Sequence, residues 1–226
     1  MTRVSVRTFW IGAPESGKTS LLTSYTKNVF PQQYVPSVYE NYTTQVDNFL
    51  YEGTKRNINL IISTATVDDE TPTAKNEEEY EPQSDVVVIV CAIDFPESFK
   101  TAEKDLIPKA KTQLPGKPVI IVGTKTDLRK DEDTIQRLAA KNEHPVTLKE
   151  GMKLAKRAGI QNYVECSAKE LGSVKAVFGE VLKEHFMNET KTRKKAAPTT
   201  TSTCFGAMCL KGGDAIADQL GFVGYG

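Results

Sequence analysis

Residues 12–20 read GAPESGKTS and match the pattern G-x-x-x-x-G-K-[ST], which decides the fold that the rest of the chain must supply. In a loop of this kind the backbone amides point inward at phosphate oxygens, and the following helix adds the positive end of its dipole. A strand-like run precedes the loop, and the helical stretch KTSLLTSY continues from it. We therefore predict a phosphate-binding loop formed by Gly12, Ala13, Pro14, Glu15, Ser16, Gly17, Lys18, Thr19 and Ser20.

Four side chains define the chemistry expected of this loop. The ammonium group of Lys18 reaches the β and γ phosphates, and the hydroxyl group of Thr19 ligates Mg²⁺. Pro14 has no backbone N–H, so it withdraws one phosphate donor and adds bulk. Glu15 brings a negative charge close to the phosphates, and we expect it to face solvent.

Short apolar runs outside the loop predict buried strands: VSVRTFWIG, INLII, DVVVIVCAID, KPVIIVGTK and NYVECSA. Runs of Val and Ile without strict alternation are typical of a parallel sheet covered on both faces. The stretch QVDNFLYEGTKRNINLII predicts a hairpin that turns near Glu52 and Gly53, so one edge strand should be antiparallel. Because helical patterns lie between the strands, we predict a doubly wound α/β domain.

Two helices can be placed from their own residues. Thr147 and Glu150 form a capping box, and Met152, Ala155 and Ala158 fall on one face of the helix that follows. The stretch SVKAVFGEVLKEHF repeats apolar residues at helical spacing and predicts an amphipathic closing helix.

Composition excludes several functional classes. The chain has 226 residues, with 29 basic and 29 acidic side chains, a balance that does not favour a nucleic-acid partner. No stretch has the length and apolarity of a membrane span, and the first residues are too short and polar for a secretory signal. The four cysteines lack metal-site spacing, and Cys91 and Cys166 lie in strand-like runs as small buried thiols. A reducing cytoplasm fits best.

Two further loops carry the signature of a base pocket. GTKTD ends one predicted strand and ECSAK ends the next, at the sheet edge where such folds bind ligands. Asp127 can accept two hydrogen bonds from the N1 and N2 groups of guanine, the Lys125 stem can lie along the base, and the Ala168 amide can donate to O6. TKTD alone would read as an ordinary charged loop, but the second loop makes the pair specific. The predicted base-binding residues are Thr124, Lys125, Asp127, Leu128, Ser167, Ala168 and Lys169.

Together these motifs resemble the small GTPases, and more narrowly the Rho family, over roughly residues 4–186. The resemblance implies the P-loop NTPase small-GTPase fold, with a mostly parallel six-stranded sheet and helices on both faces. DLRKDEDTIQRLAAKNEHPVTLKEG is similar to the extra helical insert of Rho proteins, expected here at about residues 129–145, and Thr124 matches a variant of the Rac branch. GTP or GDP, Mg²⁺ and a role in cytoskeletal or membrane signalling follow as expectations.

The segment FPQQYVPSVYENY resembles the first switch and effector segment of that family. By position, Phe30 would pack against guanine, Tyr34 would cover the phosphates, and Ser37 would replace the magnesium-binding threonine, so that Thr19 and Ser37 form the metal pair. An exchange factor and effector proteins are the expected protein partners. The expected effector-contacting residues are Val35, Pro36, Val38, Tyr39, Glu40, Asn41 and Tyr42.

The stretch NINLIISTATVDDETP departs from the family pattern D-x-x-G-Q. Read by position, Ser63 replaces the aspartate, Thr66 the glycine and Val67 the glutamine. Serine has no charge for the metal shell, threonine resists the backbone angles of glycine, and valine cannot hold the attacking water. Because phosphoryl transfer depends on positioning and electrostatics, and one lost group commonly costs about 10²- to 10³-fold, we expect slow hydrolysis and assign no catalytic residue. The acidic run VDDE is interpreted as a solvated loop.

The end of the chain has a different composition. We place the GTPase-like domain at residues 1–188 and a flexible tail at 189–226, first basic and then glycine-rich. The sequence ends in GYG, without the prenylation cysteine of Rho proteins, so the basic residues would give only weak contact with an anionic membrane at the inner face of the plasma membrane. Palmitoylation of Cys204 or Cys209 is one hypothesis, and an unmodified disordered tail is the other.

Three functional hypotheses are compatible with these residues. The leading one is a GTP-dependent switch with impaired hydrolysis. The second is a nucleotide-independent interaction module that keeps the fold, favoured by the residues that replace D-x-x-G. The third is a conventional GTPase in which Asp68 or Asp69 of VDDE takes over the missing functions.

Overall fold

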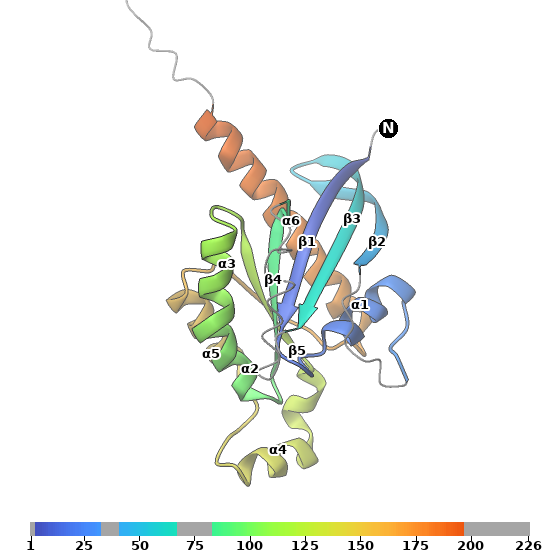
Figure 1. Cartoon of the computed structure of the whole chain (residues 1–226). Helices are drawn as coiled ribbons and strands as arrows, with labels where there is room; N and C mark the ends of the chain where they lie inside the picture. Colours follow the sequence, from blue (N-terminus) through green and yellow to red (C-terminus); the bar gives the residue numbers. More distant parts are fainter. Residues whose placement is uncertain (1–2, 33–40, 67–82, 197–226) are drawn as a thin grey trace, which may run out of the picture.

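The protein is described here by a computed structural model covering residues 3–32, 41–66 and 83–196. Its centre is one six-stranded sheet with the strand order β2-β3-β1-β4-β5-β6 (Figure 1). All neighbouring strands run parallel except β2 and β3, so the predicted mostly parallel sheet is confirmed. The strands are β1 (Val4–Gly12), β2 (Asn41–Tyr51), β3 (Thr54–Thr66), β4 (Val86–Ala92), β5 (Val119–Thr124) and β6 (Asn162–Glu165).

The exception is the hairpin that the sequence predicts. β2 and β3 pair antiparallel as far as Tyr51 and Thr54, and the turn between them holds Glu52 at φ 47° and Gly53 at φ 74°. Both residues lie in the left-handed region that tight hairpin turns require. β2 therefore forms one edge of the sheet.

Helices cover both faces of the sheet. They are α1 (Lys18–Lys27), α2 (Pro96–Thr101), α3 (Ile107–Gln113), α4 (Glu132–Ala139), α5 (Leu148–Arg157) and α6 (Leu171–Ala196), with a π-helical turn at Ala102–Leu106 and a 3₁₀ turn at Thr126–Lys130. α1 and α6 contribute Leu21, Leu22 and Phe178 to one core cluster. α2, α3 and α5 contribute residues such as Phe99 and Leu154 to a second cluster on the opposite face. Because β4 lies in the centre with every side chain buried, its sequence VVVIVCA is apolar throughout.

Aromatic stacking joins α1 and α6 to the sheet. Phe178 of α6 stacks on Trp10 of β1 with ring centroids 4.9 Å apart and on Tyr25 of α1 at 3.5 Å. Trp10 is completely buried, and its Nε1 donates to the hydroxyl group of Thr8 at 3.0 Å, so its polar atom is satisfied. This stack fixes the helix that starts at the phosphate loop.

α5 confirms one detail of the sequence analysis and corrects another. The capping box of Thr147 and Glu150 is present in both directions. Ala155 is buried as expected, but Met152 is 56% exposed. The helix turns Gly151 and Leu154 inward instead, because Gly151 has no side chain and the ring of Tyr163 lies against it.

The end of α6 also differs from expectation. The predicted boundary near residue 188 falls inside the helix, which continues to Ala196. Arg193 pairs with Glu189 one turn earlier at 2.8 Å, and Thr190 Oγ1 donates to the Phe186 carbonyl at 2.9 Å. Residues 189–196 contain no Gly or Pro, so helix propensity allows this extension. Within the described part of the chain, no helix is long and apolar enough to span a bilayer.

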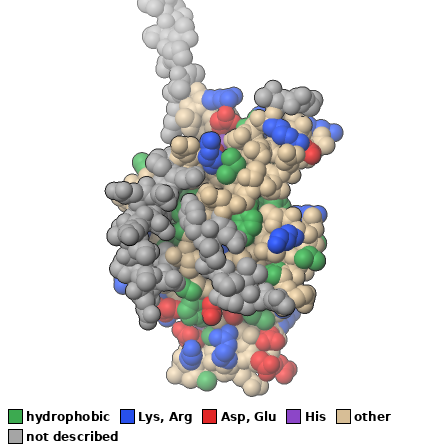
Figure 2. Space-filling view, turned by 45° about the vertical axis from the view of Figure 1, so that its right-hand side comes forward, with side chains coloured by type: hydrophobic (Ala, Val, Ile, Leu, Met, Phe, Trp, Pro, Cys, Tyr) green, Lys and Arg blue, Asp and Glu red, His purple; other side chains and the backbone are tan. Residues whose placement is uncertain are grey.

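The predicted insert contains α4, which projects from the end of the sheet at which β4 and β5 stop (Figure 1). Asp131 caps this helix, accepting from the Thr134 amide at 2.9 Å and from its hydroxyl group at 2.7 Å. Acidic and basic side chains are interspersed at this end of the molecule (Figure 2).

Two helical glycines should respond in opposite ways to alanine. A Cβ at Gly179 in α6 would meet no atom within 4 Å, so Gly179→Ala should stabilise the fold by about 1 kcal/mol through helix propensity. A Cβ at Gly151 would lie 2.1 Å from the Tyr163 ring, so Gly151→Ala should destabilise it by about 1–3 kcal/mol. Urea denaturation of both variants measures the two effects, and a stabilising Gly151→Ala would contradict the packing described for α5.

Candidate nucleotide-binding site

The phosphate loop connects the end of β1 at Gly12 to the start of α1 at Lys18. A Cβ at Gly12 would lie only 2.3 Å from the carbonyl oxygen of Val90, because β1 and β4 run side by side there. Gly17 has φ 82°, and a Cβ on it would lie 3.1 Å from the hydroxyl oxygen of Thr124. Both glycines of the motif are thus required by backbone conformation and close approach.

Lys18 folds back over the loop that precedes it. Its side chain is buried, and Nζ donates to the Gly12 carbonyl at 2.9 Å, with the Ala13 carbonyl at 3.4 Å. Pro14 and Glu15 are both exposed, and the exposure of Glu15 agrees with the expectation from the sequence. The backbone of Glu15 lies in the left-handed region at φ 59°. The ammonium group of Lys18 therefore lies against the backbone of the loop, whereas the side chain of Glu15 is exposed to solvent.

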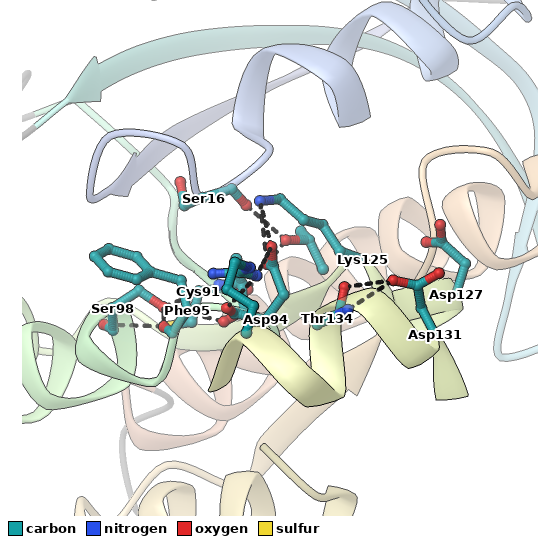
Figure 3. Close-up of polar contacts among 12 residues, drawn as sticks. Ser16, Cys91, Asp94, Phe95, Ser98, Lys125, Asp127, Asp131 and Thr134 are labelled. Atoms are coloured by element: carbon teal, nitrogen blue, oxygen red, sulfur yellow. Dashed lines mark hydrogen bonds and ion pairs between the residues drawn. The ribbon is translucent and has the colours of Figure 1, made fainter. Parts of the chain in front are cut away.

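Thr124 ties the phosphate loop to the sheet. This buried side chain ends β5, and its Oγ1 donates to the Ser16 carbonyl at 2.6 Å and lies 3.1 Å from the Cys91 carbonyl oxygen. Figure 3 labels Ser16 and Cys91, the residues that it contacts. Ser16 is itself almost fully buried. One hydroxyl group thus fixes the loop between β1 and α1 relative to β4 and β5.

A cavity of about 250 Å³ opens beside Thr124 and the phosphate loop. Its walls come from the phosphate loop, the segment after α1, the loop after β5 and the loop after β6. The lining residues, all of them predicted from the sequence, are Gly17, Ser20, Phe30, Thr124, Lys125, Asp127, Leu128, Ser167, Ala168 and Lys169. The structure thus brings the two base-pocket loops together at one edge of the sheet.

Asp127 is held on this cavity by residues of the other loop. Its Oδ1 accepts from the Ser167 hydroxyl group at 2.7 Å, and its Oδ2 lies 2.8 Å from Nζ of Lys169. Partial burial raises the pKa of the Asp127 carboxyl group, but the hydrogen bonds from Lys169 and Ser167 outweigh it and leave the pKa below its ordinary value. The carboxylate is therefore ionised at neutral pH and can only accept hydrogen bonds.

Lys125 and Phe30 complete the walls. Lys125 adopts the left-handed region at φ 61°, and its Nζ lies 3.1 Å from Asp94, whose carboxylate also lies 3.4 Å from Arg137 of α4. Phe30 is half-buried, and Nζ of Lys169 lies 6.0 Å from its ring centroid. The long stem of Lys125 and the Phe30 ring offer flat apolar surfaces next to a carboxylate, which suits an aromatic base with N–H donors.

Sequence reasoning missed Asp94 and Arg137. Asp94 directly follows the run VVVIVCAI, so its place at the carboxyl end of β4 was the available signal. Nothing local marked Arg137, which lies 43 residues further along the chain.

The end of β3 lies beside the phosphate loop. Parallel pairing aligns Ser63 with Phe9, Thr64 with Trp10 and Thr66 with Gly12, the first residue of the loop motif. Ser63 and Thr64 are both buried. The positions read from the sequence as D-x-x-G therefore end next to the phosphate loop, and the exchange of the motif residues stays a prediction.

Several predicted residues lie outside the described residues: Tyr34, Val35, Pro36, Ser37, Val38, Tyr39, Glu40, Val67, Asp68, Asp69, Cys204 and Cys209. Of the predicted effector segment, Asn41 is exposed at the start of β2 and Tyr42 packs against the cluster under α1. Thr19 is half-buried in the first turn of α1. In residues 3–32, 41–66 and 83–196, no three His, Cys, Asp or Glu side chains gather as a metal site.

A glycine–lysine phosphate loop next to a cavity with an aspartate wall, at the carboxyl edge of this sheet, defines the small-GTPase form of the P-loop α/β fold. The model of the Ras family matches residues 7–187. The chain is also 36% identical over 198 residues to the GTP-binding protein RHO1 of Saccharomyces cerevisiae, a match that covers 84% of this chain and 88% of RHO1. The chain therefore belongs to the Ras family, and it is a Rho-like member.

The Thr124 tie can be tested by removing only its hydroxyl group. Thr124→Val keeps the shape of the buried side chain but leaves the Ser16 carbonyl without this donor. The free energy of unfolding in urea should fall by about 1–3 kcal/mol. Thr112→Val is the matched control, because the Thr112 hydroxyl bonds an exposed helix carbonyl that water can satisfy. Equal losses in both variants would contradict a special role for Thr124.

Proposed function

We propose that the protein is a guanine-nucleotide-binding signalling protein, a GTP-dependent switch with slow intrinsic hydrolysis. The observation that carries this proposal is the cavity of about 250 Å³ that shares Gly17 with the phosphate loop and Asp127 with the base loop. A nucleotide needs both parts in one continuous site, with the phosphates at a helix N-terminus and the base against a hydrogen-bonding wall.

The residues fit the ligand part by part. Gly12 and Gly17 allow backbone to approach where a Cβ would collide, which is what a phosphate cradle requires. The Asp127 carboxylate can accept from N1–H and N2–H of guanine, whereas adenine offers no such pair. Mg²⁺, which supplies charge neutralisation to bound phosphates, would be held by the hydroxyl groups of Thr19 and Ser37 together with phosphate oxygens.

Slow hydrolysis follows from the residues at the end of β3 and just after it. At the positions of D-x-x-G-Q the chain has Ser63, Thr66 and Val67. A serine hydroxyl group is neutral and cannot replace a carboxylate in the metal shell, and a valine side chain cannot hydrogen-bond the attacking water. Groups that position the metal and the water are thus changed, while the binding residues are retained.

In this proposal the GTP-bound protein presents residues 35–42 to effector proteins, and an exchange factor replaces GDP. The family resemblance places this signalling at the cytoskeleton or at a membrane. Lys191, Arg193 and Lys194 are exposed on α6 and would make weak contact with an anionic bilayer. With slow turnover, exchange and localisation would set the active population more than hydrolysis does.

A second candidate function is a nucleotide-independent interaction module. The neutral Ser63 and Thr64 at the end of β3 favour it, because the metal shell lacks a carboxylate there. The continuous cavity, which joins phosphate-loop residues to the predicted base-binding residues, favours the switch instead. Nucleotide binding separates the two functions directly.

Purified protein should contain tightly bound GDP or GTP, identified by chromatography after denaturation. After the nucleotide is removed, calorimetric titration with GDP and Mg²⁺ should give saturable binding. Asp127→Asn should weaken GDP binding by at least about tenfold and improve binding of xanthosine diphosphate, because the amide N–H can donate to the extra carbonyl of xanthine. Protein that comes out empty and gives no heat with GDP or GTP would refute the switch.

Hydrolysis should respond to restoration of the missing groups. In single-turnover assays the wild type should cleave GTP slowly, and Ser63→Asp/Val67→Gln should be faster by about 10²-fold, since both positioning groups return. Thr64→Asp/Val67→Gln is the matched control, because residue 64 stands one position away from the aspartate of the motif. If the Thr64 pair accelerates cleavage and the Ser63 pair does not, the assignment of Ser63 is wrong.

A further inference from the structure

Arg129 and Glu165 form a two-pronged ion pair next to the base cavity. NH1 of Arg129 lies 2.8 Å from Oε2 of Glu165, and NH2 lies 2.7 Å from Oε1. The side chains are 28% and 12% exposed, so the pair is largely withdrawn from water. Parallel N–H···O bonds of this kind fix both distance and orientation, which a single contact does not.

The pair joins the two loops that line the cavity. Arg129 follows Asp127 by two residues, on the 3₁₀ turn after β5. Glu165 is the last residue of β6 and precedes Ser167 by two residues. β6 has only four residues and pairs with β5 alone at the sheet edge. Two backbone hydrogen bonds continue this pairing into the loops, from the Cys166 amide to the Gly123 carbonyl at 2.8 Å and from the Thr126 amide to the Cys166 carbonyl at 3.2 Å. The ion pair adds a side-chain connection beside them.

Both members of the pair are fixed from further directions. NH2 of Arg129 also donates to the Val146 carbonyl at 3.0 Å, which fastens the chain that returns from α4. Oε1 of Glu165 also accepts from the Tyr163 hydroxyl group at 2.7 Å. A Cβ at Gly123 or Gly151 would collide with the Tyr163 side chain, so these two glycines leave the room that its ring occupies. Neither side chain of the pair can turn away without breaking several contacts.

The orientation of Asp127 depends on the spacing between these loops. Both of its oxygens are held by Ser167 and Lys169, which lie on the β6 loop and not on its own. A relative shift of the loops therefore moves the partners of Asp127 as well as Ala168 on the cavity wall. Displacements of about 1 Å can change affinity or rate by about 10²-fold where a ligand is held by directed bonds.

We propose that the Arg129–Glu165 pair is a positioning device for guanine recognition: it holds the loops after β5 and β6 at the spacing in which Asp127 and Ala168 address one base. Neither residue lines the cavity, so both act through Asp127 and its partners. This inference rests on the proposed binding of guanine nucleotides, and it assigns base specificity to residues outside the pocket.

The position of the pair predicts that its removal lowers the specificity for guanine as well as the affinity for the nucleotide. Inosine diphosphate lacks the 2-amino group of guanine, so it makes one hydrogen bond fewer to Asp127. If the pair orients Asp127, removal of the pair should weaken the binding of GDP more than the binding of inosine diphosphate. If the pair had only a structural role, its removal would weaken the binding of both nucleotides by the same factor, because the phosphate and ribose contacts are common to them.

Three variants test this in the full-length chain. Arg129→Lys keeps the charge and removes the fork, and Glu165→Gln keeps the shape and removes the charge. Arg129→Glu/Glu165→Arg exchanges the partners. Arg157→Lys is the matched control, because Arg157 of α5 forms an exposed ion pair with Glu103 of the π-helical turn, and neither residue lines the cavity. Thermal unfolding monitored by circular dichroism confirms that each protein is folded at the assay temperature.

Dissociation of fluorescent GDP and inosine diphosphate is then measured for every variant. In Arg129→Lys and Glu165→Gln, GDP should dissociate about tenfold faster, and the preference for GDP over inosine diphosphate should fall at least about threefold. The exchanged pair should recover part of that preference, and Arg157→Lys should retain all of it.

The result separates this inference from the proposed function. A wild-type protein that prefers GDP, with variants that keep the full preference or lose both nucleotides equally, would overturn the positioning role alone. A wild-type protein that binds neither nucleotide would overturn the proposed function and this inference with it.

Discussion

The close approach between the phosphate loop and the end of β5 is the constraint on which the rest of the site depends. Gly17 lies where a Cβ would meet the Thr124 hydroxyl oxygen at 3.1 Å, and that hydroxyl group holds the Ser16 carbonyl at 2.6 Å. Because Thr124 ends the strand whose next loop carries Asp127, this contact sets the distance between the phosphate end and the base end of the cavity. A ligand that bridges both ends needs this distance to be fixed before it binds.

The chain has 29 basic and 29 acidic side chains, so its charges act mainly through local ion pairs and not through a net charge. The carboxylates around the cavity each pair with a cation from another segment: Asp94 with Lys125, Asp127 with Lys169, and Glu165 with Arg129. The Asp94–Lys125 and Glu165–Arg129 pairs are largely shielded from water, so they hold geometry better than exposed pairs such as Lys183 with Glu180, whereas Lys169 of the third pair is itself exposed. The cation positions link loops distant in sequence, which explains why the pocket keeps its shape at the end of an open sheet.

Much of the fold and pocket was accessible from the sequence because it is encoded over short distances. The phosphate loop, the hairpin at Glu52 and Gly53 and the capping box at Thr147 each depend on neighbours within a few residues. The inward placement of Met152 was wrong because helical spacing alone does not show that the ring of Tyr163 lies against Gly151. The Arg129–Glu165 pair was beyond reach for another reason: 36 residues separate its members, and only the sheet brings them together.

In the proposed function, nucleotide binding and cleavage depend on different parts of this architecture. The residues that line the cavity lie on the phosphate loop, on α1 and the segment after it, and on the loops after β5 and β6. The positions that the proposal reads as D-x-x-G, residues 63–66, are the last residues of β3, which lies on the other side of β1 from β4, β5 and β6. A neutral Ser63 in place of an aspartate would therefore remove a charge from the phosphate end without altering the contacts of Asp127 at the base end. In this proposal turnover is slow while Asp127 keeps its partners, so nucleotide recognition does not depend on the cleavage groups.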